Sequence, residues 1–411
     1  MPTPPTSRHA ALASTLPAAP AAAGLASRGQ EVATDPLLFA TFLDLVQIPS
    51  PSRAEARVAA YVRAFCAARA VVVREDDAAA KVGGESGNLI VDLPATDPAR
   101  GGEIVTMFLA HMDTVTPAEP VRIIRENGLI RTDGAAVLGA DAKSGVAVML
   151  AVLDELVRTR PSHGPLRFVF SVNEESGPSG AEFLDDDTLA HAIGLVLDSS
   201  GDTGTLVAET PTARFFDLTF HGRAAHAGLA PEKGVNAIAM AAAALAALPQ
   251  GRLDANTLVN IGAIRGGERR NVVPPLVTCE GEVRCFAPAR CEDVIARVRA
   301  VCEDAAARFG GRAEVVDRPA FTGYSLTPDD VPVARVRAAM RGLGVEAVLT
   351  RHGGGSDANE LVRRGVPAVN IGMGYTANHS TAESIPEAKL RWVYDLAHAL
   401  ATQASHWPPE R

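Results

Sequence analysis

The chain has 411 residues, of which 47% are hydrophobic, and its formal net charge is −9. This length allows two domains or one large domain with an insertion, and this composition is sufficient for a hydrophobic core. The sequence has no Lys/Arg-rich block of the kind that binds nucleic acid or anionic membranes, and no apolar run near the roughly 20 residues that a membrane span needs. We therefore expect a globular protein without nucleic-acid or membrane partners.

The first 34 residues are rich in alanine and proline, and the prolines interrupt the apolar runs. This pattern favours a disordered tail over a secretory signal. The five cysteines lack the short paired spacings of zinc ribbons and redox motifs. A sparse, odd set of cysteines in a long chain is typical of reduced thiols, so we expect a cytoplasmic protein.

Helices and short apolar strands alternate from residue 35 onward. Residues 36–46 have a helical pattern, and Ser52 with Glu55 has the spacing of a capping box for a second helix through residue 68. A further helix is expected over 143–158. Four runs rich in Val, Ile, Leu and Phe read as buried strands, at 88–94, 103–113, 166–175 and 192–200. This order predicts an α/β fold with a central, mainly parallel sheet flanked by helices.

Between residues 212 and 316 the order changes to strand, helix, two strands, helix and strand. This β-α-β-β-α-β unit, with helices over 234–248 and 291–309, predicts a small inserted domain. Helix and strand then alternate again, and a last helix is expected from 386 to about 406. The predicted division is a tail of 1–34, a first domain of 35–210 that is completed by 318–411, and an inserted domain of 211–317.

Polar residues of metal-binding types follow the apolar runs. In open α/β sheets, ligand sites gather at the carboxyl ends of the strands. The residues found there are His111, Asp113, Asp141, Glu174, Glu175, Asp198 and His379. A single Asp or His in such a position is more often a turn residue, an N-cap or an ordinary polar side chain. So many carboxylates at the ends of buried strands, however, favour a cation that neutralises them.

Mixed imidazole and carboxylate ligands suit Zn²⁺, Mn²⁺ or Co²⁺, and the candidates outnumber the ligands of one ion. We therefore expect two ions that share a bridging carboxylate. Such a pair polarises a carbonyl and activates a water that attacks the carbonyl carbon. The water needs a base that does not bind metal. Because Glu174 and Glu175 are adjacent, one of them can bind a metal while the other faces the water.

Several motifs occur in a fixed order between residue 35 and the end of the chain: HMDT, TDGAAVLGADAKSG, NEESG, AAHAG, GGGSDAN and HST. In this order they resemble the motifs of the M20 family of dinuclear metallopeptidases, most closely its peptidase T-like branch. The resemblance implies a catalytic α/β domain that carries an inserted lid domain. The implied roles are His111 and Asp198 as ligands of one metal, Glu175 and His379 as ligands of the other, Asp141 as the bridge, Asp113 as the residue that orients His111, and Glu174 as the general base.

Other residues are candidates for contacts with the substrate. His226 is either a surface residue on a glycine-rich loop or, as the resemblance implies and the motif favours, a catalytic residue that stabilises the tetrahedral intermediate, often across a dimer. Gly354 and Gly355 before Ser356 form either a turn with an N-cap or a set of N–H donors for a substrate carboxylate. The weaker candidates are Asn271, Arg284 and Arg351.

The resemblance also bears on the substrate. In this family the non-bridging carboxylate ligand tends to be Asp in aminopeptidases and dipeptidases, but Glu in carboxypeptidases and deacylases. Asp198 thus indicates cleavage of small peptides with a free N-terminus, as by a tripeptide aminopeptidase, although Ala142 replaces the second Asp that is frequent in the peptidase T branch. A carboxypeptidase or N-acyl amino acid deacylase is the alternative, and a metal- or peptide-binding homologue without turnover is a remoter one. Whether the inserted domain forms a homodimer stays open.

Overall fold

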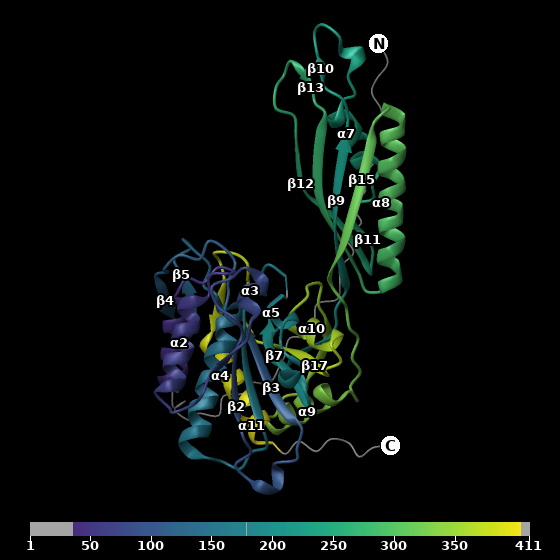
Figure 1. Ribbon diagram of the computed structural model, residues 1–411. Helices are drawn as coiled ribbons and strands as arrows, with labels where there is room; N and C mark the ends of the chain where they lie inside the picture. Colours follow the sequence, from purple (N-terminus) through teal and green to yellow (C-terminus); the bar gives the residue numbers. More distant parts are fainter. Residues whose placement is uncertain (1–35, 178, 404–411) are drawn as a thin grey trace, which may run out of the picture. The chain divides into compact units, whose positions relative to one another are not determined.

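The computed structural model describes residues 36–177 and 179–403 (Figure 1). The predicted disordered tail of residues 1–34 lies outside the described residues. The described part contains an eight-stranded central sheet, a five-stranded sheet and two smaller sheets of three and two strands. None of its helices is long and apolar enough to cross a membrane.

The central sheet has the strand order β1-β2-β6-β3-β7-β17-β8-β16. Four of its seven pairings are parallel, namely β6 with β3, β3 with β7, β7 with β17 and β8 with β16. The strands are β1 (Arg74–Glu75), β2 (Leu89–Leu93), β3 (Val105–His111), β6 (Leu166–Ser171), β7 (Ala192–Ser199), β8 (Thr205–Glu209), β16 (Val348–Arg351) and β17 (Ala368–Gly372). The prediction of a mainly parallel central sheet is confirmed, and the four predicted strands are β2, β3, β6 and β7.

Helices cover both faces of the central sheet because its strands direct apolar side chains to both sides. In β3, Phe108 and Ala110 pack into one core, whereas Met107 and Leu109 pack into the other. The first core includes residues of α1 (Pro36–Val46), α2 (Ala56–Ala67), α4 (Ala140–Thr159), α9 (Val331–Gly342) and α11 (Glu387–Thr402). The second includes residues of α5 (Ser179–Glu182), α6 (Asp186–Leu189) and α10 (Asp357–Arg363). The short α3 (Ala78–Val82) and the 3₁₀ helix η1 (Pro98–Arg100) lie in connections.

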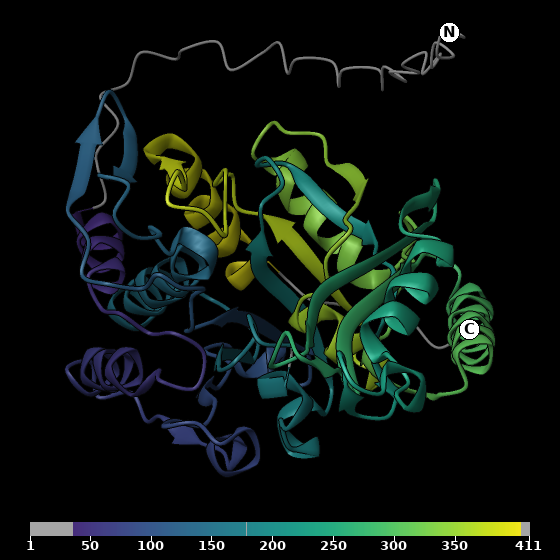
Figure 2. The ribbon, with the colours of Figure 1, turned by 90° about the horizontal axis from the view of Figure 1, so that it is seen from above.

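The five-stranded sheet has the order β11-β12-β14-β9-β15, and all its pairings are antiparallel. Its strands are β9 (Thr212–His221), β11 (Gly251–Asp254), β12 (Thr257–Gly266), β14 (Leu276–Cys285) and β15 (Arg312–Phe321). The helices α7 (Ala237–Ala247) and α8 (Pro288–Phe309) share one core with it, and α8 runs along the strands (Figures 1 and 2). The predicted β-α-β-β-α-β order is confirmed, with β11 as an additional edge strand.

Two smaller sheets were not predicted. β10 (Ala225–His226) pairs with β13 (Val272–Val273), and the 3₁₀ helix η2 (Pro231–Lys233) follows β10. β4 (Ile123–Glu126) and β5 (Leu129–Thr132) form a hairpin, and β18 (Ser384–Pro386) pairs with β5. The hairpin turn is Asn127-Gly128, with φ of 52° and 74°. Both residues thus have the positive φ that a type I′ turn requires, and Asn-Gly is its usual sequence.

The predicted capping box of Ser52 and Glu55 is wrong. Glu55 is the N-cap residue of α2, but its side chain makes no capping hydrogen bond. The Ser52 hydroxyl donates instead to Asp113 Oδ2 over 2.7 Å. The Glu55 carboxylate accepts from the backbone N–H groups of Arg53 and Asn173, over 2.8 and 3.0 Å. Both side chains are thus engaged by longer-range partners that lie near the candidate ligands.

Helix ends otherwise differ from the prediction by a few residues. α4 begins at Ala140, three residues before the predicted start, and α8 also begins three residues early, at Pro288. α7 begins at Ala237 because the Asn236 side chain caps it, accepting from the N–H groups of residues 238 and 239. α11 ends at Thr402, and the predicted end near residue 406 lies outside the described residues.

Candidate metal centre

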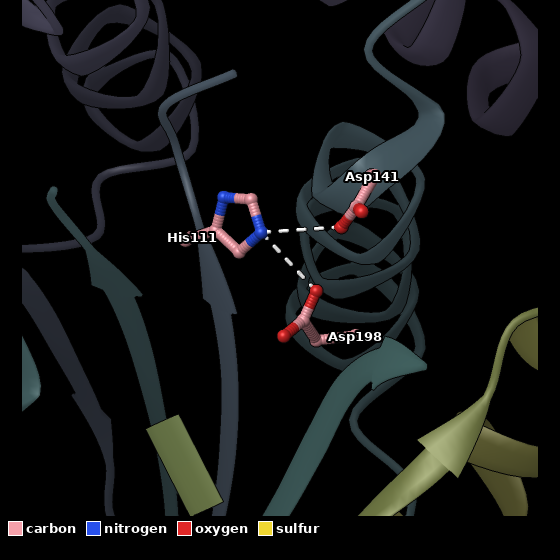
Figure 3. Close-up of side chains that lie close together, drawn as sticks. All are labelled: His111, Asp141 and Asp198. Carbon is pink, nitrogen blue, oxygen red and sulfur yellow. Dashed lines mark hydrogen bonds and ion pairs between the residues drawn. The ribbon is translucent and has the colours of Figure 1, made fainter. Parts of the chain in front are cut away.

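Three candidate ligands meet at the carboxyl ends of β3 and β7. His111 is the last residue of β3, Asp198 is next to last in β7, and Asp141 lies in the first turn of α4. His111 Nε2 lies 3.3 Å from Asp141 Oδ1 and 3.1 Å from Asp198 Oδ1, and Figure 3 shows both carboxylates turned toward this nitrogen. The three ligand atoms lie within 4.8 Å of one another, which is close enough to hold one metal ion.

A second group consists of Asp141, Glu175 and His379. His379 Nε2 lies 3.3 Å from Asp141 Oδ2 and 3.0 Å from Glu175 Oε2. Asp141 thus offers Oδ1 to the first group and Oδ2 to the second. The other oxygen of Glu175, Oε1, is buried and has no hydrogen-bond partner within residues 36–177 and 179–403. A buried carboxylate oxygen without a donor is costly, which fits a cation at this position.

Asp113 fixes the two neighbouring glutamates. Its fully buried carboxylate accepts from the backbone N–H of Glu174 at Oδ1, over 3.0 Å, and from that of Glu175 at Oδ2, over 3.1 Å. After β6 the chain leaves the extended conformation at Asn173, with φ of 58°. Glu175 then reaches His379, while Glu174 Oε2 lies 4.0 Å from the Nε2 atom of His111 and belongs to neither ligand group.

The orientation of His111 is fixed at its second ring nitrogen. Nδ1 lies 2.9 Å from the backbone carbonyl oxygen of Asp113 and 3.5 Å from its Oδ1 atom. A proton on Nδ1 would be donated to this carbonyl, which leaves Nε2 free to bind a metal ion. The resemblance implied that Asp113 orients His111. The sequence does not reveal that the shorter contact is made by the backbone carbonyl of Asp113 and not by its carboxylate.

Negative charge exceeds positive charge in the centre. Burial raises the pKa of Glu174 well above its usual range, and the charge of Asp198 raises it further. Burial lowers the pKa of His111, but Asp198, Asp113 and Asp141 together hold it well above its usual value. Hydrogen bonds to Asp141 and Glu175 raise the pKa of His379 to about 10. Even two protonated imidazoles leave a surplus of carboxylates, so the donor set fits divalent cations.

Two polar residues beside His379 were missed by the sequence analysis. The Glu383 carboxylate accepts from the backbone N–H groups of Gly139 and Asp141, over 2.6 and 3.0 Å. Burial raises the pKa of Glu383 to about 7, whereas these backbone donors lower it. Asn378 donates from Nδ2 to Asp141 Oδ2 over 2.9 Å. Both residues lie within four positions of His379. Their closeness to the HST motif was the signal in the sequence that could have identified them.

Two further buried charges lie behind the ligands and were also missed. Lys143 donates from Nζ to the backbone carbonyl of Ile48 over 2.6 Å, and burial lowers its pKa to about 7. Asp357 accepts from the Ser171 hydroxyl over 2.5 Å, and burial raises its pKa to about 7. Lys143 lies in the motif around Asp141 and Asp357 lies in the motif GGGSDAN, so both motifs were available signals, although neither indicates that the side chain is buried.

Five of the predicted substrate-binding residues form a group that we call the arginine–glycine cluster: Arg284, Arg351, Gly354, Gly355 and Ser356. Arg351 Nε lies 2.7 Å from Glu209 Oε2, and its Nη2 donates to Asn256 Oδ1 over 2.8 Å. Its guanidinium lies 3.9 Å from the centre of the Phe286 ring. The side chain is still 47% exposed, so it has room for a further partner.

The remaining members of the arginine–glycine cluster surround the start of α10. Arg284 is paired with Glu282, with Nη2 2.9 Å from Oε2, and donates from Nη1 to the carbonyl of Gly353. Ser356 forms a capping box with Asn359 at the N-terminus of α10. At Gly355 a Cβ would lie 2.8 Å from the Phe321 ring, so only glycine fits. Ser356 is therefore an N-cap, which was one of the two predicted alternatives.

His226 and Asn271 lie in the small β10–β13 sheet and its flanks. His226 Nδ1 accepts from the N–H of Gly228 over 3.2 Å, and the backbone carbonyl of Asn271 accepts from the N–H of Ala227 over 3.0 Å. Among the described residues, no hydrogen bond or ion pair joins either residue to the two ligand groups or to the arginine–glycine cluster. The structure thus brings the predicted ligands together but leaves these two apart from them.

Comparisons with known proteins match this architecture. The family model of the M20 peptidase dimerisation domain matches residues 210–309, and that of peptidase family M28 matches residues 88–213. The chain is 36% identical to the uncharacterized protein YqjE of Bacillus subtilis, with 90% of this chain and 98% of that one covered.

Two solved structures are similar over nearly their whole length. The crystal structure of aminopeptidase PepT from Bacillus cereus is 36% identical, with 90% of this chain and 98% of that chain covered and a TM-score of 0.80. The structure of a tripeptidase from Staphylococcus aureus is 34% identical, with 89% and 97% covered and a TM-score of 0.83. The M28 match is confined to one segment, whereas these likenesses extend over both large sheets. The chain therefore belongs to the M20 family of metallopeptidases, in its peptidase T-like branch.

Proposed function

We propose that this protein is an aminopeptidase that uses two divalent metal ions to cleave small peptides with a free N-terminus, tripeptides foremost. The observation that carries the proposal is that Asp141 is shared by two ligand groups, with Glu174 beside His111 but in neither group. The similarity to an aminopeptidase and to a tripeptidase supports the substrate class. Asp198 as the non-bridging carboxylate points in the same direction.

The ligands divide between two metal positions. His111 and Asp198 would hold one ion, Glu175 and His379 the other, and Asp141 both. Zn²⁺ suits this imidazole and carboxylate set best, with Mn²⁺ and Co²⁺ as alternatives. Such ions, when bound, polarise the carbonyl of the scissile peptide bond and lower the pKa of a water molecule.

Glu174 would act as the general base. Its carboxylate takes a proton from the attacking water and returns it to the leaving amine nitrogen. Asp113 supports this role because it holds the backbone of both Glu174 and Glu175, which directs one side chain to the water and the other to a metal. His226, from β10, would stabilise the negative oxygen of the tetrahedral intermediate.

The arginine–glycine cluster, together with Asn271, would bind the other end of the peptide, and Ser356 would contribute as the N-cap of α10 and not through a contact of its hydroxyl with the substrate. A guanidinium binds a carboxylate through two parallel hydrogen bonds, and Arg351 is exposed enough to do so.

We also propose residues 35–210 and 318–411 as the catalytic domain and 211–317 as the lid domain. The match of residues 210–309 to a dimerisation domain supports a homodimer through this lid. The buried cysteines, none of them in a disulfide, agree with a cytoplasmic protein.

Hydrolysis of one tripeptide in three forms tests the proposal. The purified protein is stripped with a chelator, supplied with Zn²⁺, Mn²⁺ or Co²⁺, and assayed on the free, the N-acetylated and the C-amidated tripeptide. We expect cleavage of peptides with a free amine only, and no cleavage without metal. Preference for the N-acetylated form would instead indicate a carboxypeptidase or deacylase.

A further inference from the structure

The first turn of α4 is capped from a distant part of the chain. The first N–H groups of a helix have no partner within the helix, and a side chain at the N-cap usually accepts from them. The N-cap of α4 is Gly139, which has no side chain to do this. Glu383, 244 positions away from Gly139, supplies both acceptors, one oxygen to the N–H of Gly139 and the other to that of Asp141.

This capping interaction concerns the residue that both ligand groups share. Asp141 lies in the first turn of α4, but its ψ of 109° is not helical, so the regular hydrogen bonds of the helix do not hold its backbone. Its carboxylate must direct Oδ1 to His111 and Oδ2 to His379. The hydrogen bond from its N–H to Glu383 Oε1 is therefore a main constraint on where that carboxylate lies.

One short segment contacts Asp141 at three points. Asn378 donates to Oδ2, His379 Nε2 lies 3.3 Å from Oδ2, and Glu383 accepts from the backbone N–H. The segment is itself fixed, because the N–H of Glu383 donates to the carbonyl of Ser380, and β18, which begins directly afterwards, pairs with β5. Glu383 is only 1% exposed, so water does not compete for its two acceptors.

We propose that Glu383 is a positioning residue that sets the orientation of Asp141 relative to His379 and so couples the two metal positions. This inference rests on the proposed two-metal function. A glutamine at this position has one acceptor oxygen and one NH₂ group, so it would oppose a donor to a backbone donor. The backbone at residue 139 or 141 must then move, and the bridging carboxylate moves with it.

Metal binding to the Glu383→Gln variant tests the inference. Each protein is stripped of metal and titrated with Zn²⁺ and with Mn²⁺ in a calorimeter, and bound metal is counted by mass spectrometry after gel filtration. We expect the variant to bind both ions 10- to 100-fold more weakly, as is usual when a group that supports a ligand is removed. Activity at fixed metal concentration would fall accordingly.

Glu387→Gln is the matched control. Glu387 lies four positions after Glu383, and its replacement by glutamine is the same chemical change. Its carboxylate, however, pairs with Arg125 on the surface, with Arg125 Nε 2.6 Å from Oε1. We expect this control to bind metal with wild-type affinity. Should Glu383→Gln not fold, Glu383→Asp keeps the charge but shortens the reach, and weaker metal binding is again expected.

The outcomes separate the role of Glu383 from the two-metal function. Wild-type protein that binds no metal would overturn the proposed function, and the role of Glu383 with it. Wild-type protein that binds two ions, together with a folded Glu383→Gln variant of equal affinity, would overturn the role of Glu383 alone. A lower melting temperature of the metal-free variant without a change in metal affinity would also overturn that role, since Glu383 would then be a cap for α4 and nothing more.

Discussion

The candidate metal centre and the arginine–glycine cluster both gather charged side chains, but only the charges of the cluster are balanced by neighbouring groups of opposite sign. In the cluster, Arg351 is paired with Glu209 and Arg284 with Glu282. In the centre, the carboxylates outnumber the imidazoles, and burial opposes their charge. A region with balanced charge is stable without a ligand, and one of its ion pairs can be replaced by a pair with the ligand when the ligand binds. A region with unbalanced charge, such as the candidate metal centre, needs a bound cation before it can act.

Glu174→Gln would have the largest effect, because it separates chemistry from metal binding within the centre. Glu174 belongs to neither ligand group, so metal content should stay at the wild-type value. Loss of a general base lowers turnover by about 10²- to 10⁴-fold. The measurements are kcat/KM on a free tripeptide and metal per chain. Glu126→Gln, on the exposed hairpin, serves as the control, and metal loss in step with activity would contradict the assignment.

Arg351→Met tests whether the balanced cluster exchanges its partner for a substrate carboxylate. A hydrogen bond to a charged group contributes about 1.5 to 3 kcal/mol, so KM for the free tripeptide should rise by about 10- to 100-fold. KM for the C-amidated tripeptide should change little. The measurement is KM for both substrates, determined at saturating metal.

Arg318→Met is the matched control for Arg351→Met. Arg318 also pairs with a carboxylate, that of Asp217, and also lies over a ring, that of Phe215. Its partners Asp217 and Phe215 are not those of the cluster, so its replacement should leave both KM values unchanged. If Arg351→Met raised KM equally for the two substrates, Arg351 would act through its packing on Phe286 and not through a carboxylate.

Ser356→Ala would have the smallest effect and concerns stability only. The Ser356 hydroxyl caps α10, and loss of such a cap costs about 1 kcal/mol. We expect a lower free energy of unfolding in denaturant and an unchanged KM. Ser356→Asn, which retains a capping group, should restore most of the stability. A rise in KM for both variants would show instead that the hydroxyl contacts substrate.

The sequence was sufficient to predict the two large sheets in outline and the set of candidate ligands, but not the two smaller sheets. Apolar runs of strand length identify β2, β3, β6 and β7, and the rule that sites form at carboxyl strand ends selects the residues that follow them. His111, Asp198 and Glu175 were found in this way because each lies within a few residues of a strand end. Only the local pattern of an apolar run followed by a polar residue was needed to identify them.

The residues that position the ligands could not be predicted, because their partners are remote in sequence. Ser52 and Glu55 had the spacing of a capping box, yet they bind Asp113 and Asn173, which are 61 and 118 positions away. Glu383 gives no local sign that it caps a helix 244 positions earlier. The β4–β5 hairpin is different, since its Asn-Gly turn was a local signal that the sequence analysis overlooked.

The position of β17 between β7 and β8 has a consequence for synthesis. A chain made from its N-terminus carries His111, Asp141 and Asp198 long before residues 368–372 exist. Until then the growing sheet lacks the strand that separates β7 from β8. His379 follows later still. A metal ion that reaches the nascent protein would therefore meet all three candidate ligands of the first group, whereas the second group would still lack its histidine.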